Sequence, residues 1–259
     1  MPGVAEGPSS VYINLTLERC ARKMEFDRFG KGQFEEVHGR NEIQFPQLEL
    51  RRPHLNDIPE IRLPHGYSMR HYRQGDERAW GEIMTEAFNP YWDEHRFNIL
   101  MKPHYGFRPE RVIFVLCDGV PVGSASAFRW PGAGRGRGYI HMVGVKKEHC
   151  GAGLGYWLTA ACISRFREEG LHSAMLQTED FRIPAIKHYI RLGFKPFLVI
   201  EEHRAKWLHI LERIGRPDLA DKMDIRGMPV MGKARFWYRT MLVSNYMSWL
   251  NFKADMMGG

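Results

Sequence analysis

The sequence predicts an α/β (α+β) protein with a mixed, mostly antiparallel central sheet, helices on both faces of that sheet, and N- and C-terminal extensions. Three observations support this fold class. Between Tyr67 and Ile200, short β-rich runs alternate with helical apolar patterns. Two of those runs flank the dipeptide Asp118-Gly119, a typical hairpin turn. The composition, with 44% hydrophobic and 26% charged residues, is that of a globular protein.

Length and hydropathy argue against a membrane-spanning protein and a secreted protein. The 259 residues suffice for one large domain, or for a core of roughly 130 residues with additions. The longest apolar run, Val112 to Cys117, is far shorter than the roughly 20 residues that span a bilayer. Residues 1–10 lack the basic start and the apolar stretch of a secretory signal. We therefore expect a cytoplasmic protein that does not bind membranes.

Charge and cysteine content restrict the partners. The excess of 37 Lys and Arg over 30 Asp and Glu gives a net charge of +7, which favours an anionic partner such as a nucleic acid or a phosphorylated cofactor. The cysteines form no C-x-x-C pair, so neither a disulfide framework nor a metal site is predicted, and a reducing cytoplasm fits best. The four cysteines are Cys20, Cys117, Cys150 and Cys162.

The first half of the chain contains an extension and the beginning of the sheet. Residues 1–66 are interpreted as an N-terminal extension in which Val11 to Leu17 is a candidate strand. A strand is then expected at Tyr67 to Tyr72, and Gly75-Asp76 offers a cap for a helix that ends at Asn89-Pro90. The helix has apolar side chains on one face, namely Trp80, Ile83, Met84, Ala87 and Phe88. Asp93 can cap a shorter helix that Pro103 ends.

The second half alternates strands and helices. The pattern predicts, in order, strands at Val112 to Cys117, Val120 to Phe128 and Tyr139 to Val145, a helix from Leu154 that Gly170 ends, a strand at Ser173 to Thr178, a helix from Pro184 to about Leu192, and a strand at Lys195 to Ile200. Pro131 to Gly138 is expected to form a loop. Residues 201–259 are interpreted as a C-terminal extension, with an amphipathic helix at Glu201 to Ile214 and an aromatic segment at Phe236 to Phe252.

The segment Gly151-Ala152-Gly153-Leu154-Gly155 is the strongest functional signal. Glycines at alternate positions between a strand and a helix let a ligand approach the backbone closely. The free N–H groups of the first helical turn and the positive end of the helix dipole then favour an anion, most naturally a diphosphate. Tyr156 stands where a dinucleotide-binding Gly-x-Gly-x-x-Gly motif needs glycine, and no Gly-Lys-Ser/Thr of a P-loop follows.

The flanking residues of this loop resemble a known family. The run from Val143 to Gly155 resembles the acyl-coenzyme A binding segment of the GNAT superfamily, in which a strand valine is followed by five residues and then by Arg/Gln-x-x-Gly-x-Gly. About thirty residues later, Pro184 to Phe194 is similar to a second motif of that superfamily, with an Ala, a Tyr four residues on and a Gly-Phe. The resemblance covers about Tyr67 to Ile200. Cys150 replaces the usual Arg or Gln, and Arg182 replaces a frequent Asn.

The resemblance implies a GNAT-like acyl-CoA-binding catalytic domain at residues 67–200, with acetyl-CoA as co-substrate. The expected reaction is N-acetyl transfer to a primary amine of an unidentified acceptor by direct attack in a ternary complex. Since the loop would hold the coenzyme mostly through backbone N–H groups, both departures from the motif should be tolerated. The expected cofactor-binding residues are Val143, Gly144, Val145, Cys150, Gly151, Ala152, Gly153, Leu154, Gly155, Tyr156 and Arg182, and Lys146 and Lys147 are candidates for neutralising the phosphates.

The resemblance also implies catalytic roles. A backbone N–H near Val145 would polarise the thioester carbonyl, and Tyr189 would act as the general acid near the thioester sulfur. His141, four residues before Val145, is expected on the same strand face and is the first candidate for the base. Glu179 and Asp180 are alternatives, and ordered water is a further one.

Other functions and partners stay open. A non-catalytic acyl-CoA sensor or interaction protein is the main alternative, and a nucleic-acid-binding protein is another, although nucleic acid is not the expected partner. The expected partner is a small-molecule or peptide amine, and a homodimer is a candidate assembly. The loop Arg135 to Gly138 and the aromatic run Phe236 to Tyr238 are weaker signals for nucleic acid and membrane. The last strand of the fold is expected from Phe236 to Val243 or from the N-terminal extension.

Overall fold

The computed structural model describes residues 47–88, 92–104, 106–129, 134 and 136–232, together with the backbone of two short strands before them. These two strands, β1 (Met24–Phe26) and β2 (Gly32–Phe34), pair antiparallel within a separate compact unit, Met1–Phe45. Val11 to Leu17, Cys20, and Phe236 to Phe252, for which the sequence suggested particular structures or roles, lie outside the described residues.

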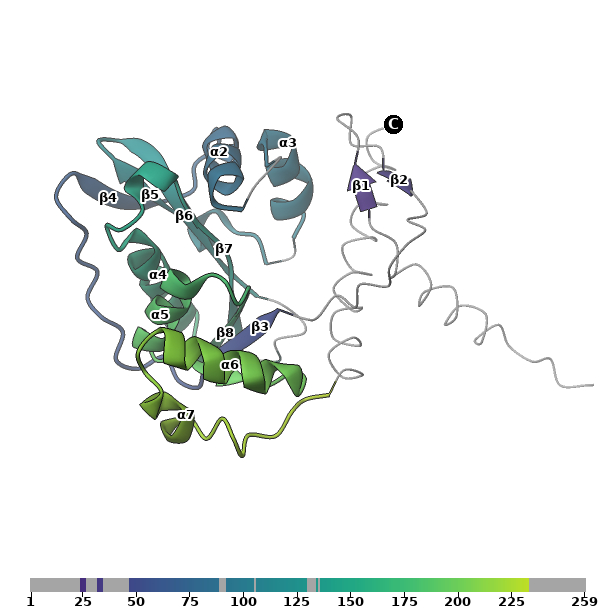
Figure 1. Ribbon diagram of the computed structural model, residues 1–259. Coiled ribbons are helices and arrows are strands. Elements are labelled where there is room, and N and C mark those ends of the chain that lie inside the picture. The colour runs from purple at the N-terminus through teal and green to yellow at the C-terminus, as the bar shows by residue number, and fades with distance from the viewer. Residues whose placement is uncertain are drawn as a thin grey trace, which may run out of the picture. The chain divides into compact units, whose positions relative to one another are not determined.

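A seven-stranded sheet with the order β4-β5-β6-β7-β8-β3-β9 forms the framework of the main unit (Figure 1). All neighbouring strands in it run antiparallel except β7 and β8, which are parallel. This confirms the predicted mixed, mostly antiparallel sheet. The strands are β3 (Leu48–Arg52), β4 (Tyr67–His71), β5 (Val112–Cys117), β6 (Val120–Phe128), β7 (Arg137–Val145), β8 (Ser173–Thr178) and β9 (Lys195–Phe197).

Helices cover both faces of the sheet, as the sequence predicts (Figure 1). Strand side chains alternate between the two cores, so that Phe114 packs with Trp80 of α2 while its neighbour Val115 packs with Leu158 of α4. The helices are α2 (Glu77–Phe88), α3 (Glu94–Arg96), which continues as a π-helix (Phe97–Met101), α4 (Leu154–Glu168), α5 (Ile183–Arg191), α6 (Glu202–Arg213) and α7 (Asp218–Lys222).

Local turn and cap signals are confirmed. Asp118 and Gly119, with φ of +46° and +85°, join β5 to β6 as a tight hairpin turn. The carboxylate of Asp93 accepts the amide of Arg96 at 2.8 Å and so caps α3. Gly170, at φ +71°, follows α4, as expected for a glycine that ends a helix.

The strand next to β8 comes from the N-terminal extension, one of the two alternatives that the sequence left open. β3 pairs antiparallel with β8 on one side and with β9 on the other. The buried Arg52 at the end of β3 stabilises this position of the strand, because its guanidinium donates hydrogen bonds to the carbonyl oxygens of Leu192 and His54. The prediction that β9 extends to Ile200 is wrong, since the strand ends at Phe197.

Two further features concern membranes and thiols. Within the described residues, every helix is too short or too polar to cross a bilayer. The thiols of Cys117, Cys150 and Cys162 are free, and that of Cys162 is buried among apolar side chains.

The position of β3 leads to a stability prediction. Leu50 is fully buried in the core beside α4, so Leu50→Ala should lower the free energy of unfolding by about 2–5 kcal/mol, because it removes buried methyl groups and leaves a cavity. Urea unfolding monitored by circular dichroism measures the change. The control Ile61→Ala, at a side chain that is 37% exposed, should change it by less than about 1 kcal/mol. A Leu50→Ala variant as stable as the wild type would contradict the assignment of this strand.

Candidate active site

The glycines between β7 and α4 shape an open loop. Gly151 and Gly153 adopt φ of +93° and +74°, the left-handed region that favours glycine. A Cβ atom at either position would meet no other atom within 4 Å. Gly155 lies in the first turn of α4, where a Cβ atom would be 3.9 Å from Nδ1 of His188. The backbone of the loop therefore faces open space on the side of its first two glycines.

The amides of this loop are available to a ligand. The first helical bonds of α4 run from the amides of Tyr156 and Trp157 to the carbonyl oxygen of Gly153, at 3.1 and 3.3 Å. In the part of the chain that the structure describes, the amides from Gly151 to Gly155 donate to no protein acceptor. These N–H groups, at the positive end of a 15-residue helix, form the kind of site that binds phosphate.

Strands β7 and β8 stop pairing beside this loop. Their parallel register ends at Ile140 and Leu176, although β7 continues to Val145 and β8 continues to Thr178. On the side of β7 that faces β8, the main chain from His141 to Val145 therefore has no strand partner among the described strands. Its N–H and C=O groups can bind an extended ligand, as the resemblance to GNAT enzymes implied for this strand.

The three β7 residues expected to bind the cofactor have different surroundings. The side chains of Val143 and Val145 pack against the core on the α4 side. Gly144 is buried under α2, where a Cβ atom would lie 3.1 Å from the Cβ of Ala87 and 3.2 Å from the Sδ of Met84. A side chain at position 144 would therefore require α2 to move away by a few tenths of an ångström. Any contact of Gly144 with the cofactor has to use its main chain.

A β-bulge in β7 changes the expected position of His141. Ser124 pairs with Gly144 and Ser126 pairs with His141, so two residues of β7, Met142 and Val143, lie opposite a single residue of β6. The expectation that His141 and Val145 share a strand face is wrong, because the inserted residue reverses the alternation. His141 instead lies on the α2 side.

The ring of His141 is part of an aromatic stack. It lies 5.7 Å from the ring of Phe128 and 5.5 Å from that of Tyr139, and the ring of His104 covers Phe128 at 4.6 Å. Burial, with a smaller contribution from His104, lowers the pKa of His141 to about 3. The imidazole is therefore neutral at physiological pH and is a weak base.

Tyr189 is placed on the buried face of α5. Its side chain is 7% exposed, and its ring meets the ring of Phe194 edge-on at 6.2 Å. Burial raises the pKa of Tyr189 well above its usual value, and the nearby Arg182 opposes this rise. The phenol is thus protonated at neutral pH, as a general acid must be, and its hydroxyl makes no hydrogen bond with the described residues.

Glu179 and Arg182 form an ion pair in the connection between β8 and α5. Nε of Arg182 is 2.5 Å from one carboxylate oxygen of Glu179, and the other oxygen accepts a hydrogen bond from Nε2 of Gln47 at 2.7 Å. The guanidinium of Arg182 donates to the carbonyl oxygen of Ala87 at 3.2 Å and lies 4.5 Å from the ring of Phe88. Arg182 therefore links this connection to the end of α2.

The other charged candidates are held elsewhere. Asp180 forms an ion pair with Lys206 of α6 at 2.6 Å, and this hydrogen bond lowers the pKa of Asp180. Lys146 is 3.2 Å from the carboxylate of Glu82 on α2. Cys150 is exposed, and its Sγ is 3.6 Å from the carbonyl oxygen of Lys146. Lys147 is exposed.

The structure thus brings some of the predicted residues together. Glu179 and Arg182 form an ion pair just before α5, the helix that carries Tyr189, and both charged groups influence the pKa of the phenol. His141 is on the other face of the sheet, and Asp180 is held by α6. Sequence reasoning missed Gln47, which precedes a strand of only five residues, and His104, whose stacking partners no local pattern indicates.

It also missed the basic side chains on the exposed face of α5. The signal was present in the sequence, as Lys187, His188 and Arg191 have helical spacing and the helix contains no acidic residue.

The sequence is similar to those of known acetyltransferases. Residues 78–194 match the acetyltransferase (GNAT) family. A mycothiol acetyltransferase from Pseudarthrobacter chlorophenolicus is 33% identical over 53% of this chain and 45% of its own length, and one from Salinispora tropica is 33% identical over 56% and 50%. The chain spans about half the length of these relatives.

A crystal structure of a GCN5-related N-acetyltransferase from Sphaerobacter thermophilus is also similar. It has a TM-score of 0.48 and 21% identity, and the similarity covers 73% of this chain and 54% of that one. The family match itself extends from α2 to the end of α5 and includes the open loop and Tyr189. Residues 78–194 of this chain are therefore similar to the acetyltransferase (GNAT) family.

Proposed function

We propose that this protein is an N-acetyltransferase that transfers the acetyl group of acetyl-CoA to a primary amine by direct attack in a ternary complex. The observation that supports it best is the adjacency of two sets of unpaired backbone groups, at the loop Gly151 to Gly155 and along the end of β7. Both lie within the residues that match the GNAT family. Binding of the coenzyme and turnover with a panel of amines test the proposal, and binding without turnover would instead support a sensor.

The chain's own groups account for recognition of the coenzyme. The amides from Gly151 to Gly155 would bind the diphosphate, which needs several donors and favours the positive end of a helix. The unpaired edge of β7 from Val143 to Val145 would hold the extended arm between diphosphate and thioester through main-chain hydrogen bonds. Acetyl-CoA supplies an activated thioester, whose carbonyl a backbone N–H near Val145 would polarise.

Tyr189 is proposed as the general acid. Attack by the amine breaks the C–S bond, and the departing thiolate needs a proton. The buried, protonated phenol of Tyr189 has no other hydrogen-bond partner among the described residues, so it is free to donate one. The helix that carries Tyr189, α5, follows β8 through the short connection that contains Glu179 and Arg182, which supports a position for the phenol near the end of β8.

The base must accept the proton of an ammonium group. Since the pKa of His141 is about 3, a transfer from an ammonium near pKa 9 would be uphill by about 8 kcal/mol. This cost disfavours His141 and leaves Glu179, acting directly or through ordered water. Glu179 is 33% exposed, although its carboxylate is also bound by Arg182.

The proposed acceptor is a small-molecule or peptide amine. Two relatives that match about half of this chain are named mycothiol acetyltransferase. Their name makes a small-molecule amine the first class to test here.

Gly153→Asp should weaken binding of coenzyme A. The carboxylate would lie beside the diphosphate, and its repulsion should raise Kd on the order of a hundredfold relative to Gly153→Asn. The Asn variant is a matched control, because Asn has the same shape and also tolerates the left-handed conformation of this residue. Isothermal titration calorimetry measures both affinities. Equal affinities of the two variants would refute the diphosphate site.

Tyr189→Phe should preserve binding and slow catalysis. Loss of a general acid typically costs about a hundredfold or more in kcat, whereas the apolar contacts of the ring are retained. Steady-state kinetics with the best amine of the panel measures the change, and calorimetry checks that Kd is constant. Tyr72→Phe is the control, since it removes the hydroxyl of another buried tyrosine, in the core beside α2. A Tyr189→Phe enzyme with the wild-type kcat would exclude this role.

His141→Gln should leave the shape of the pH–rate profile unchanged. With its pKa lowered to about 3, His141 stays neutral between about pH 5 and pH 8, so its titration contributes no acidic limb to kcat/KM in that range. Profiles of the wild type and the variant should therefore be parallel. If a limb near pH 6.5 is present in the wild type and absent in the variant, His141 is the base.

A further inference from the structure

The exposed face of α5 borders two cavities that the proposed mechanism does not use. Ile186 and Tyr189 point into the core, whereas Lys187, His188 and Arg191 lie on the other side of the helix. The first cavity has a volume of about 400 Å³ and is lined by Ile183, Pro184, Lys187, His188 and Arg191. The second has a volume of about 500 Å³, shares Lys187 and Arg191 with the first, and has a partly apolar wall. Lys187 and Arg191 thus line both cavities and form the wall that the two cavities share.

Two positively charged side chains on the exposed face of α5 have no ion-pair partner among the described residues. Lys195 and Arg216 also line the second cavity, but Arg216 is bound by the carboxylate of Asp218 through two contacts of 2.9 and 3.0 Å. Within the described part of the chain, Lys187 and Arg191 have no ion-pair partner, and both are exposed. Burial and the neighbouring Arg191 lower the pKa of His188, so this imidazole is neutral at physiological pH. The charge of the shared wall therefore comes from Lys187 and Arg191.

This wall adjoins the glycine loop. Nδ1 of His188 is 3.9 Å from the position of a Cβ atom on Gly155, and the rings of His188 and Tyr156 are 6.0 Å apart, edge to face. The guanidinium carbon of Arg191 is 4.8 Å from the centre of the Tyr156 ring. A ligand whose diphosphate is bound by the loop amides would reach Lys187 and Arg191 with groups attached directly to that diphosphate.

We propose that Lys187 and Arg191 form a phosphomonoester subsite, and that its ligand is the 3′-phosphate of coenzyme A. This inference rests on the proposed function. A phosphomonoester carries a charge of about −1.5 to −2 at neutral pH, which matches two unpaired cations one helical turn apart. In coenzyme A the 3′-phosphate is on the ribose that carries the diphosphate, so the loop and α5 would bind neighbouring parts of one molecule. The subsite would distinguish coenzyme A from its 3′-dephospho form.

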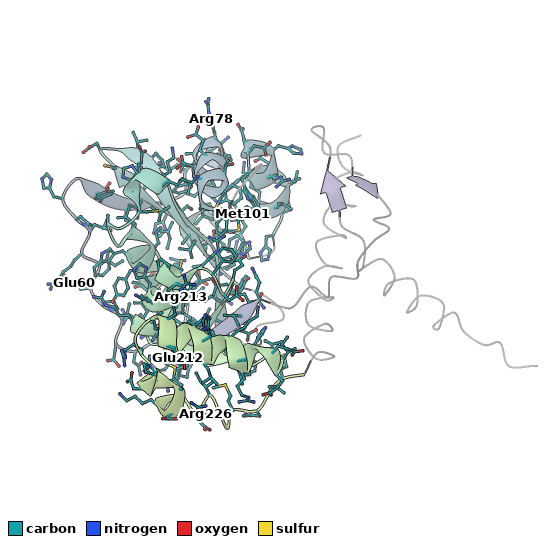
Figure 2. All side chains as sticks on the ribbon, in the orientation of Figure 1. Glu60, Arg78, Met101, Glu212, Arg213 and Arg226 are labelled. Atoms are coloured by element: carbon teal, nitrogen blue, oxygen red, sulfur yellow. The ribbon has the colours of Figure 1, made fainter. Side chains whose placement is uncertain are left out.

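Calorimetric titration of the full chain with coenzyme A and with 3′-dephospho-coenzyme A tests this subsite. The wild type should bind coenzyme A about tenfold or more tightly than the dephospho form. The double variant Lys187→Gln, Arg191→Gln should lose that preference, with the affinity for the dephospho form unchanged. Arg78→Gln is the control for a lost charge, because Arg78 is on α2, its side chain is 84% exposed, and it points away from the domain (Figure 2). It should behave like the wild type.

The other outcomes separate the two proposals. If the wild type binds both compounds equally, or if the double variant keeps the preference, the subsite is overturned while the proposed function stands. If the wild type binds neither compound, the proposed function fails and the subsite fails with it.

A second arm identifies the source of the phosphate. Inorganic phosphate should shift the NMR amide signals of Lys187 and Arg191 in the free protein, and saturating coenzyme A should abolish this effect. If the shifts persist with coenzyme A bound, the subsite serves a separate phosphorylated molecule, and its assignment to the 3′-phosphate is wrong.

Discussion

The whole site depends on consecutive backbone amides that have no acceptor within the described protein, at the start of α4. Gly151 and Gly153 keep them open, because their left-handed conformations would strain most other residues and their missing side chains leave space for a ligand. Main-chain donors place few demands on neighbouring side chains. The proposed site would therefore tolerate Cys150 and Arg182 at positions where the GNAT motif usually has other residues. Arg182 instead donates a hydrogen bond to the carbonyl oxygen of Ala87 and so joins the segment after β8 to α2.

The central sheet separates the candidate catalytic groups onto its two faces. Tyr189 packs on the face that α4 and α5 cover, whereas His141 and His104 stack on the face that α2 covers. Tyr189 and His141 are therefore on opposite faces of the sheet, and the unpaired main chain of β7 begins at His141, where β7 and β8 no longer pair. The N-terminal strand β3 completes the sheet on the far side of β8, and its neighbour Gln47 contacts Glu179 at the edge of the site.

Most of the fold and the core of the site could be predicted from local signals. The Asp118-Gly119 turn, the alternate glycines before α4 and the position of Tyr189 on α5 depend on short stretches of sequence, and the structure has each of them in place. β3 was not predicted because it has five residues and its partners are more than a hundred residues away in the chain. The face of the sheet on which His141 lies was mispredicted. One extra residue in the β-bulge reverses the alternation of side chains along β7, and no sequence pattern indicates the bulge.

An NMR titration of the isotopically labelled protein with coenzyme A tests most directly whether the amides before α4 bind the diphosphate. The largest amide shifts should occur from Gly151 to Gly155, and they should saturate together with one dissociation constant. The amides of Val143 to Val145 should shift along the same curve, because the arm of the same molecule lies along β7. Saturable shifts confined to another surface, with the amides of Gly151 to Gly155 unmoved, would contradict the proposed site.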